Sequence, residues 1–227
     1  MKTNQLQAVL AGLVLSAGAA FGQNEYVFGF TNNAVVPDAN FSGLTLATNL
    51  MGMSGAIGSV TVNLDITGGY NGDLYAYLVG PNGGFSVLLN RMGVSNSASM
   101  FGYGNPGFNV TLSDAAANGN IHYYQNVLNP GASQLTGTWQ PDGANINPLS
   151  APATFLTAGQ TAMLSSFAGS DPNGQWVLFM ADLSGGGVST LATWGLDITT
   201  TVPEPSALAL TGAGLMAFLG CRRLRRS

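Results

Sequence analysis

The chain has 227 residues, of which only 7% are charged and 46% are hydrophobic, whereas about 25% of an ordinary soluble domain is charged. Residues 23–201 contain nine acidic residues against Arg91 alone, a formal charge of −8. The apolar content excludes a highly charged disordered chain, and the shortage of lysine and arginine excludes a nucleic-acid-binding face.

The N-terminus has the plan of a secretory signal peptide. Lys2 precedes the uncharged apolar run Ala8–Ala20, which ends in small residues just ahead of Gln23. We therefore predict a signal peptide over residues 1–22, removed by signal peptidase. A buried helix is the alternative interpretation of this run.

From residue 57 onward the sequence shows the two-residue period of β-strands. In Val60–Thr67 apolar and polar side chains alternate, which predicts a half-buried strand. Asn82 and Gly83 stand between two apolar runs, a pattern typical of a hairpin. The predicted strands are Val60–Thr67, Asp73–Val79, Phe85–Asn90, Phe108–Asp114, Gln175–Asp182 and Leu191–Ile198.

Many short strands, frequent turns and no useful helical period predict an all-β sandwich. Residues 57–90 are expected to form a meander, and residues 23–56 a segment leading into the sandwich. A parallel solenoid is the alternative, but no fixed repeat supports it. The only cysteine is Cys221, so the body has no disulfide and depends on its core, which about 180 residues are enough to build.

Six short motifs occur in a fixed order between residues 57 and 199, beginning with Asn71-Gly72-Asp73-Leu74 and ending with Leu191-Ala192-Thr193-Trp194-Gly195-Leu196. This succession resembles the P domain (P/Homo B) that follows the catalytic domain of subtilisin-like proprotein convertases. The resemblance implies a jelly-roll-like β-sandwich that supports a neighbouring protease and performs no catalysis. We expect structural roles for the motif residues Gly72, Asp73, Leu74, Pro81, Gly83, Asp114, Gly174, Trp176, Asp182 and Trp194.

The chain departs from the convertase pattern in two ways. No subtilisin-like catalytic domain fits into residues 23–56, between the predicted cleavage site and the first motif-bearing strand. The stretch Gly137–Gln160 is longer than the family pattern suggests, which indicates an insertion or loop beginning near Trp139.

The C-terminus combines three features. Two prolines flank a glutamate in residues 202–206, an apolar run occupies residues 207–221, and four arginines lie within residues 222–226. The 15-residue run would be about 22 Å long as a helix, shorter than the roughly 30 Å hydrocarbon core, so it spans only with snorkelling or local thinning. The arginines are predicted to stay on the cytoplasmic side, which places the body outside.

This order of parts over residues 202–227 resembles a PEP-CTERM sorting tail. The resemblance implies a Gram-negative exporter in which an exosortase-type enzyme recognises the motif and replaces the tail, commonly alongside exopolysaccharide or biofilm production. A plain C-terminal membrane anchor is the alternative, and Cys221 is expected to be an ordinary apolar residue rather than a lipidation site. The motif residues are Val202, Pro203, Glu204, Pro205 and Ser206.

The body offers little for catalysis. His122 is the only histidine in the chain, Gly-x-Ser-x-Gly is absent, and the body has no cysteine, so neither a typical triad nor a typical zinc site is indicated. Glu25 is the only glutamate of the mature body, and no aspartate pair stands out for glycan cleavage. We expect His122 to be a surface or packing residue and the body to have no enzymatic activity.

Asp73 and Asp182 are candidate calcium ligands. Each stands at a strand end among glycines, and Ca²⁺ takes six to eight oxygen ligands. In the alternative, the Asp73 side chain caps the turn Tyr70–Gly72 and Asp182 braces the loop to Val188. No cofactor is certain from the sequence.

Several aromatic residues are candidates for stacking on sugar rings, and protein contact is the alternative. Trp176 and Trp194 fall within strand patterns and are expected in the core. The stacking candidates lie in loop-like stretches: Trp139, Tyr70, Tyr123 and Tyr124.

The sequence therefore predicts an exported β-sandwich of the outer surface or extracellular matrix, with a non-catalytic binding or structural role linked to exopolysaccharide or biofilm. The alternative is an accessory module that stabilises a separate subtilisin-like protease in trans; a glycan-cleaving enzyme has little support. The expected partners are signal peptidase, an exosortase-type enzyme, the membrane through the tail, and either exopolysaccharide or that protease.

Overall fold

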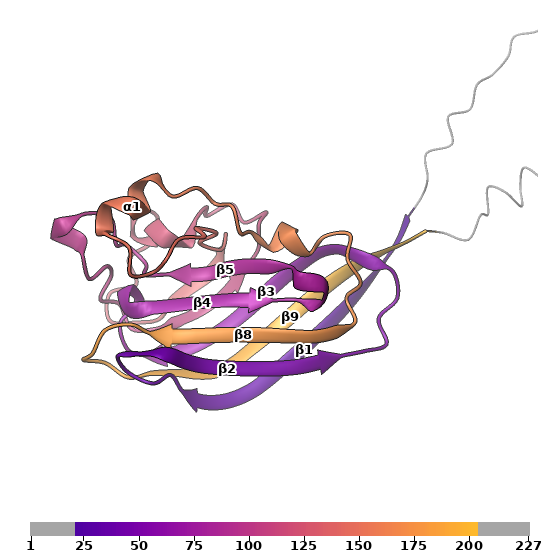
Figure 1. Cartoon of the computed structure of the whole chain (residues 1–227), viewed down its shortest axis with the longest axis horizontal. Coiled ribbons are helices and arrows are strands. Elements are labelled where there is room, and N and C mark those ends of the chain that lie inside the picture. Colours follow the sequence, from indigo (N-terminus) through magenta and orange to yellow (C-terminus); the bar gives the residue numbers. More distant parts are fainter. Residues whose placement is uncertain (1–20, 204–227) are drawn as a thin grey trace, which may run out of the picture. The chain divides into compact units, whose positions relative to one another are not determined.

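Nine strands and a few short helical turns make up residues 21–203, the part of the chain that the computed structural model describes (Figure 1). Residues Gln23–Val202 form one compact unit. Most of the predicted signal peptide and the tail from Glu204 onward lie outside the described residues. The strands are β1 (Phe21–Val35), β2 (Asn40–Leu50), β3 (Ala56–Gly68), β4 (Leu74–Val79), β5 (Phe85–Asn90), β6 (Phe108–Leu112), β7 (Leu135–Trp139), β8 (Gly174–Asp182) and β9 (Ser189–Pro203).

Helical structure in residues 21–203 is limited to the six-residue helix α1 (Pro152–Thr157) and short 3₁₀ turns. Among these residues, no helix combines the length and the apolar character that a bilayer crossing needs. The predicted tail helix, residues 207–221, is not among them. The 3₁₀ turns are η1 (Asn71–Asp73), η2 (Pro81–Gly83), η3 (Ser97–Ser99), η4 (Ile121–Asn126) and η5 (Leu164–Phe167).

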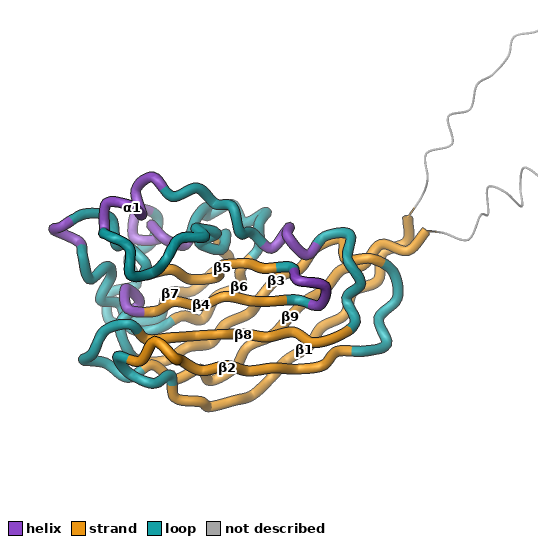
Figure 2. Tube along the Cα trace, viewed as in Figure 1, coloured by secondary structure: helices purple, strands orange, loops and turns teal. Residues whose placement is uncertain are grey.

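The strands form two sheets that face each other, which confirms a mostly β sandwich (Figure 2). One sheet has the order β1-β9-β3-β6-β7 and the other the order β2-β8-β4-β5. The pairs β2–β8, β3–β6, β3–β9, β4–β5 and β4–β8 are antiparallel, whereas β6 and β7 run parallel. Strands that follow each other in the sequence therefore often belong to different sheets.

The predicted meander over residues 57–90 is wrong in one respect. β3 pairs with β9 and β6, while β4 lies between β8 and β5 in the other sheet. Gly68 and Gly69 have φ of 73° and 64°, a conformation that favours glycine, and here the chain leaves one sheet for the other. The β4–β5 hairpin is confirmed, and its turn places Asn82 and Gly83 at positive φ.

Residues 23–56 belong to the sandwich and do not merely lead into it. β1 lies beside β9, and β2 pairs with β8 along most of its length. Both are edge strands with many exposed side chains, so the sequence shows no clear alternation there. The two sheets therefore include strands that precede residue 57.

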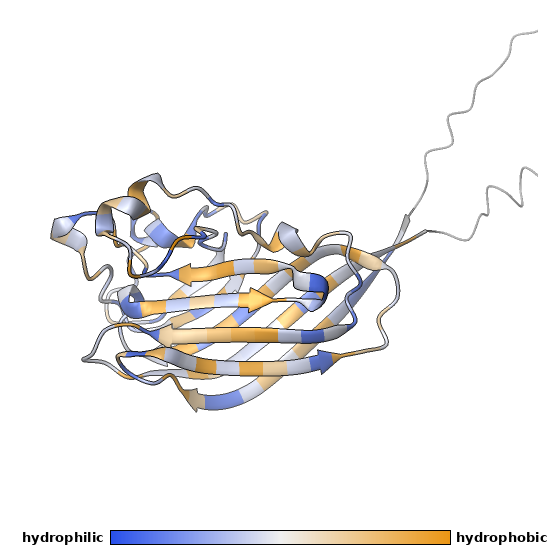
Figure 3. Cartoon of the chain, in the orientation of Figure 1, coloured by the Kyte–Doolittle hydropathy of each residue, from blue (hydrophilic) through white to orange (hydrophobic). Residues whose placement is uncertain are grey.

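The core lies between the sheets. In β3 the residues Val60, Val62, Leu64 and Ile66 are buried, as the alternating pattern predicts, and Figure 3 shows the alternation of apolar and polar residues along the strands. Burying each such side chain stabilises the fold by about 1.5–3 kcal/mol. The two expected core tryptophans are confirmed, since Trp176 and Trp194 are both buried against this cluster.

The long stretch after β7 packs along the outer edge of β5, where Figure 1 shows α1 and its flanking loops. The backbone N–H groups of Asp142 and Gly143 donate to the carbonyls of Leu88 and Val87 at 3.1 and 2.9 Å. Val87 in turn donates to Ala162 at 3.0 Å. The insertion therefore covers an otherwise open sheet edge.

Candidate functional site

The turn between β3 and β4 is fixed by one fully buried asparagine. Asn71 donates through Nδ2 to the carbonyl of Gly107 at 3.1 Å and to Oη of Tyr124 at 3.0 Å. Its Oδ1 accepts from the backbone N–H of Gly107 at 2.8 Å. The next residue, Gly72, donates its N–H to the carbonyl of Tyr103 at 2.8 Å. The motif thus holds the loop 101–107 against the start of β4.

Beside this contact lies a cavity of about 290 Å³, which we call the Tyr70 cavity. Three loops build it, the first before β4, the second around residue 102 and the third after β8. Tyr70 is 44% exposed and Phe101 is 69% exposed, so both rings are accessible from solvent. The lining residues are Tyr70, Asp73, Phe101, Gly102, Tyr103, Gly104, Ser184 and Gly185.

Asp73 and Asp182, the two calcium candidates, are brought together at this end of the four-stranded sheet. Asp182 ends β8 opposite Leu74, the first residue of β4. Asp73 is 5% exposed and Asp182 is fully buried. Oδ1 of Asp182 accepts the backbone N–H of Ser184 at 3.3 Å, whereas its Oδ2 is buried without a hydrogen-bond partner.

Burial disfavours the charged form of both carboxyl groups. It raises the pKa of Asp73, although the Ser184 hydroxyl and the Arg91 guanidinium oppose this effect. Burial also raises the pKa of Asp182 to about 6. The backbone N–H of Ser184 and the nearby Ser189 hydroxyl oppose this rise, while the carboxylates of Asp73 and Asp38 add to it. Two carboxyl groups therefore lie close together at this end of the sheet, and ionising them there destabilises the folded state.

Calcium at this pair remains a proposal. Within residues 21–203, no group of three or more His, Cys, Asp and Glu side chains is placed to hold a metal ion. A Ca²⁺ ion here would take carboxylate oxygens from Asp73 and Asp182 and complete its shell with backbone carbonyls or water. The unpartnered Oδ2 of Asp182 is the feature that fits such a ligand.

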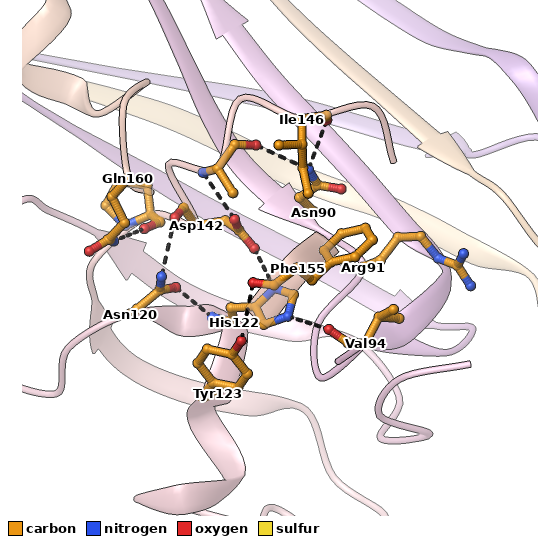
Figure 4. Close-up of polar contacts among 12 residues, drawn as sticks. Asn90, Arg91, Val94, Asn120, His122, Tyr123, Asp142, Ile146, Phe155 and Gln160 are labelled. Carbon is orange, nitrogen blue, oxygen red and sulfur yellow. Dashed lines mark hydrogen bonds and ion pairs between the residues drawn. The ribbon is translucent and has the colours of Figure 1, made fainter. Parts of the chain in front are cut away.

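His122 is a packing residue, only 3% exposed. Figure 4 shows its ring between a carboxylate and a backbone carbonyl. Nδ1 lies 2.7 Å from Oδ2 of Asp142, and Nε2 lies 2.9 Å from the carbonyl oxygen of Val94. Both neighbours are acceptors, so the protonated ring, in which both nitrogens donate, satisfies both contacts.

The environment of His122 favours the charged ring. Burial alone would lower the pKa of His122, but the hydrogen bond and charge of Asp142 outweigh it, helped by the carbonyls of Val94 and Asn90, so the pKa is raised. Phe155 stacks on the ring at a centroid distance of 5.7 Å. In a Ser-His-Asp triad the nitrogen far from the aspartate faces the serine, whereas here Nε2 faces the Val94 carbonyl inside the protein.

The stacking hypothesis is wrong for two of its four residues. Trp139 is 1% exposed and donates Nε1–H to the carbonyl of Thr136 at 2.9 Å. Tyr124 is fully buried and donates its hydroxyl to Oδ1 of Asn105 at 2.7 Å. Both rings lie in the core with their polar atoms bonded inside the protein, so neither can meet a ligand.

The other two stacking candidates are separate. Tyr123 is half-buried beside His122 at a centroid distance of 4.5 Å, while Tyr70 lines the cavity. Sequence reasoning missed Phe101 and Tyr103, which line the cavity with Tyr70. The alternation of aromatic residues with glycines in Phe101–Gly104 was the available signal.

Two family models match the chain. The proprotein convertase P-domain matches residues 57–140, and the PEP-CTERM protein-sorting motif matches residues 201–226. The two matches cover separate parts of the chain, a region similar to a P-domain and a C-terminal region similar to a PEP-CTERM sorting motif. Both resemblances are therefore confirmed. The PEP-CTERM motif implies an exported, cell-surface-sorted protein that is processed by an exosortase.

A search of curated proteins gave no match. Similar solved structures include the serine protease of Aeromonas sobria, alone and in complex with its chaperone. For the complex the identity is 16%, the TM-score is 0.44, and the match covers 81% of this chain. For the protease alone the values are 15%, 0.43 and 80%. The chain spans 27% of the protease chain in each case.

Proposed function

We propose that the P-domain sandwich is a non-catalytic binding module of the cell surface or extracellular matrix, with exopolysaccharide as its target. The observation that carries this proposal is the presence of both matches in one chain, a P-domain at residues 57–140 and a sorting motif at residues 201–226. The P-domain resemblance implies a supporting fold without catalytic groups. The PEP-CTERM motif implies that the protein is sorted to the cell surface.

The side chains of the sandwich support a non-catalytic role. His122 is the chain's only histidine, and both of its ring nitrogens are held by acceptors. General acid–base catalysis by histidine needs a nitrogen that can reach a substrate. The Tyr70 cavity, which is open to solvent, contains aromatic rings and a carboxylate instead.

We further propose a route for the chain. Signal peptidase removes residues 1–22, and the apolar stretch 207–221 holds the exported body at the inner membrane with residues 222–226 on the cytoplasmic side. An exosortase-type enzyme then acts at the motif 202–206 and releases the tail. Replacing Glu204 by alanine should leave unprocessed protein in the inner-membrane fraction, while Glu25→Ala, an exposed change in β1, should be processed normally.

The binding role is tested with residues 23–201, which lie within the compact unit, and purified exopolysaccharide of the source cells. Saturable co-sedimentation that heat denaturation of the protein abolishes supports the proposal. Hydrolysis of casein or polysaccharide by the same preparation, lost on a single substitution, contradicts the non-catalytic part.

The second candidate is an accessory module that stabilises a separate subtilisin-like protease in trans. The P-domain match at residues 57–140 favours it, because the resemblance implies support of a protease. Co-purification with such a protease and a rise in the thermal midpoint of that protease would favour this role over polysaccharide binding.

A further inference from the structure

The walls of the Tyr70 cavity are held in place by backbone hydrogen bonds. The backbone N–H of Gly72 donates to the carbonyl of Tyr103 at 2.8 Å, and the N–H of Tyr103 donates to the carbonyl of Met92 at 2.8 Å. On the other side, Leu183 donates to the carbonyl of Asp73 at 2.9 Å. A cavity fixed in this way loses little conformational entropy when a ligand enters.

Close backbone contacts add to this rigidity. A Cβ atom on Gly72 would lie 2.1 Å from the carbonyl oxygen of Phe101. A Cβ atom on Gly187 would lie 3.2 Å from Cε2 of Tyr70, so this ring rests directly against the glycine-rich loop after β8. The glycines therefore set the positions of the two exposed aromatic residues.

The Tyr70 cavity presents aromatic surface that other rings do not cover. Within residues 21–203, neither Tyr70 nor Phe101 packs against another aromatic ring. By contrast, Tyr77 and Phe179 in the four-stranded sheet stack on each other at 4.7 Å and 17°. The exposed surfaces of Tyr70 and Phe101 can accept the C–H-rich face of a sugar, because the face of an aromatic ring is electron-rich and its body apolar.

One carboxylate supplies the polar side of the Tyr70 cavity. Asp73 lines it and is 5% exposed, and a buried carboxylate makes strong hydrogen bonds to hydroxyl or ammonium donors. Arg91, the only lysine or arginine of residues 23–201, is occupied by the carbonyls of Gly72 and Met100 at 3.3 and 3.2 Å. The remaining field is negative, which opposes an anionic ligand.

We propose that the Tyr70 cavity binds one ring of a neutral or amino sugar: Tyr70 and Phe101 stack on the ring, and Asp73 accepts hydrogen bonds from its hydroxyl or ammonium groups. The volume of about 290 Å³ lies just below the range for drug-sized ligand sites, roughly 300–1,000 Å³, and suits one ring of a longer glycan. This inference rests on the proposed function and names the site and the ligand class.

The test titrates residues 23–201 with methyl glucoside, glucosamine and glucuronic acid and follows amide shifts by NMR. We expect methyl glucoside and glucosamine to bind with a Kd of about 1 mM, the range of a weak single-site ligand, and glucuronic acid at least about tenfold more weakly through charge repulsion. Phe101→Ala and Tyr70→Ala should each weaken binding about tenfold, comparable to losses measured for aromatic stacking. Asp73→Asn should weaken glucosamine more than methyl glucoside.

The matched control is Phe41→Ala. Phe41 is 57% exposed and does not line the cavity, so its variant should bind as the wild type does. Because Phe101 is 69% exposed, Phe101→Ala should keep the wild-type melting temperature. Its binding measurement therefore tests the proposal even if Tyr70→Ala unfolds. Wild-type affinity in Phe101→Ala, equal losses in Phe41→Ala, or preferred binding of glucuronic acid would overturn the proposal.

The same variants separate this inference from the proposed function. If exopolysaccharide binds the wild type and Phe101→Ala equally, the cavity is not the site, but the binding role survives. If the wild type binds neither the three sugars nor the exopolysaccharide, the inference and the proposed function both fail.

Discussion

Nδ1 of His122 lies 2.7 Å from Oδ2 of Asp142, and the two side chains are 4% and 1% exposed. The pair joins η4 to the insertion that covers the edge of β5. A buried pair of this kind costs desolvation energy, and losing one partner leaves the other charge buried and uncompensated. Its role in this sandwich is therefore structural.

Removing the ring should destabilise the fold strongly. We expect His122→Ala to lower the free energy of unfolding by about 3–5 kcal/mol, the range for breaking a buried ion pair, as measured by urea denaturation at pH 6. Glu25→Gln, at an exposed position, should change it by less than about 0.5 kcal/mol. A loss below about 1 kcal/mol in His122→Ala would show that the pair does not hold the insertion.

The His122 pair should also make stability depend on pH. Because the pKa of His122 is raised in the folded state, its contribution is fully present below the unfolded value of about 6.5 and is lost as the pH rises through the folded value. Unfolding midpoints from pH 5.5 to 9 should therefore fall more for the wild type than for His122→Gln. Parallel curves for the two proteins would contradict this assignment.

Asp182 should also make the stability of the fold depend on pH, but at lower pH than His122 does. Its pKa is about 6 in the folded protein against 3.8 for the unperturbed group, so the stabilising protonated form is lost between about pH 4 and pH 6. Without added metal, the free energy of unfolding of the wild type should fall across this interval relative to that of Asp182→Asn. The difference between the two proteins should therefore grow from pH 4 to pH 6 and stay constant above pH 6. A difference that is constant or decreasing from pH 4 to 6 would oppose the burial effect.

The calcium proposal makes a distinct prediction. If Ca²⁺ binds the unpartnered Oδ2 of Asp182 together with Asp73, millimolar Ca²⁺ should raise the melting temperature at pH 7.5 by several degrees, because a ligand of the native state stabilises it. The double change Asp73→Asn and Asp182→Asn should abolish the shift. No shift in the wild type, or an equal shift in the double variant, would remove calcium from this site.

The Asn71 contact should be among the most sensitive points of the fold. Asn71→Ala leaves the buried N–H of Gly107 without its acceptor, which costs about 1–3 kcal/mol. It also removes the hydrogen bond that Tyr124 accepts from Asn71, while the Tyr124 hydroxyl keeps its own bond to Asn105. We expect a total loss of about 2–4 kcal/mol in the free energy of unfolding. Asn109→Ala, an exposed change on β6, serves as the control and should cost less than half as much.

The sequence predicted the strands whose side chains divide cleanly between core and solvent. β3 is the clearest case, since its apolar residues from Val60 to Ile66 all face the core. It did not predict β1 and β2, because edge strands are exposed on much of their surface and lack that alternation. β7 is only five residues long and includes Gly137 at a φ of 99°, which local patterns do not indicate as a strand.

The candidate sites depend on contacts between distant residues, and this limits what the sequence can show. Tyr70 was predicted as a ligand contact, but Phe101 and Ser184 reach the same cavity from loops on either side of it. The partner of His122 is Asp142, in the insertion whose course no local pattern fixes. Trp139 stands among turn-forming residues, yet the parallel pairing of β6 and β7 draws it into the core.

The most direct test of the account is a binding isotherm of residues 23–201 with purified exopolysaccharide, measured for the wild type, Phe101→Ala and Phe41→Ala. We predict saturable binding by the wild type and Phe41→Ala and a clear loss in Phe101→Ala. No binding by the correctly folded wild type would contradict the central claim that this exported sandwich is a polysaccharide-binding protein.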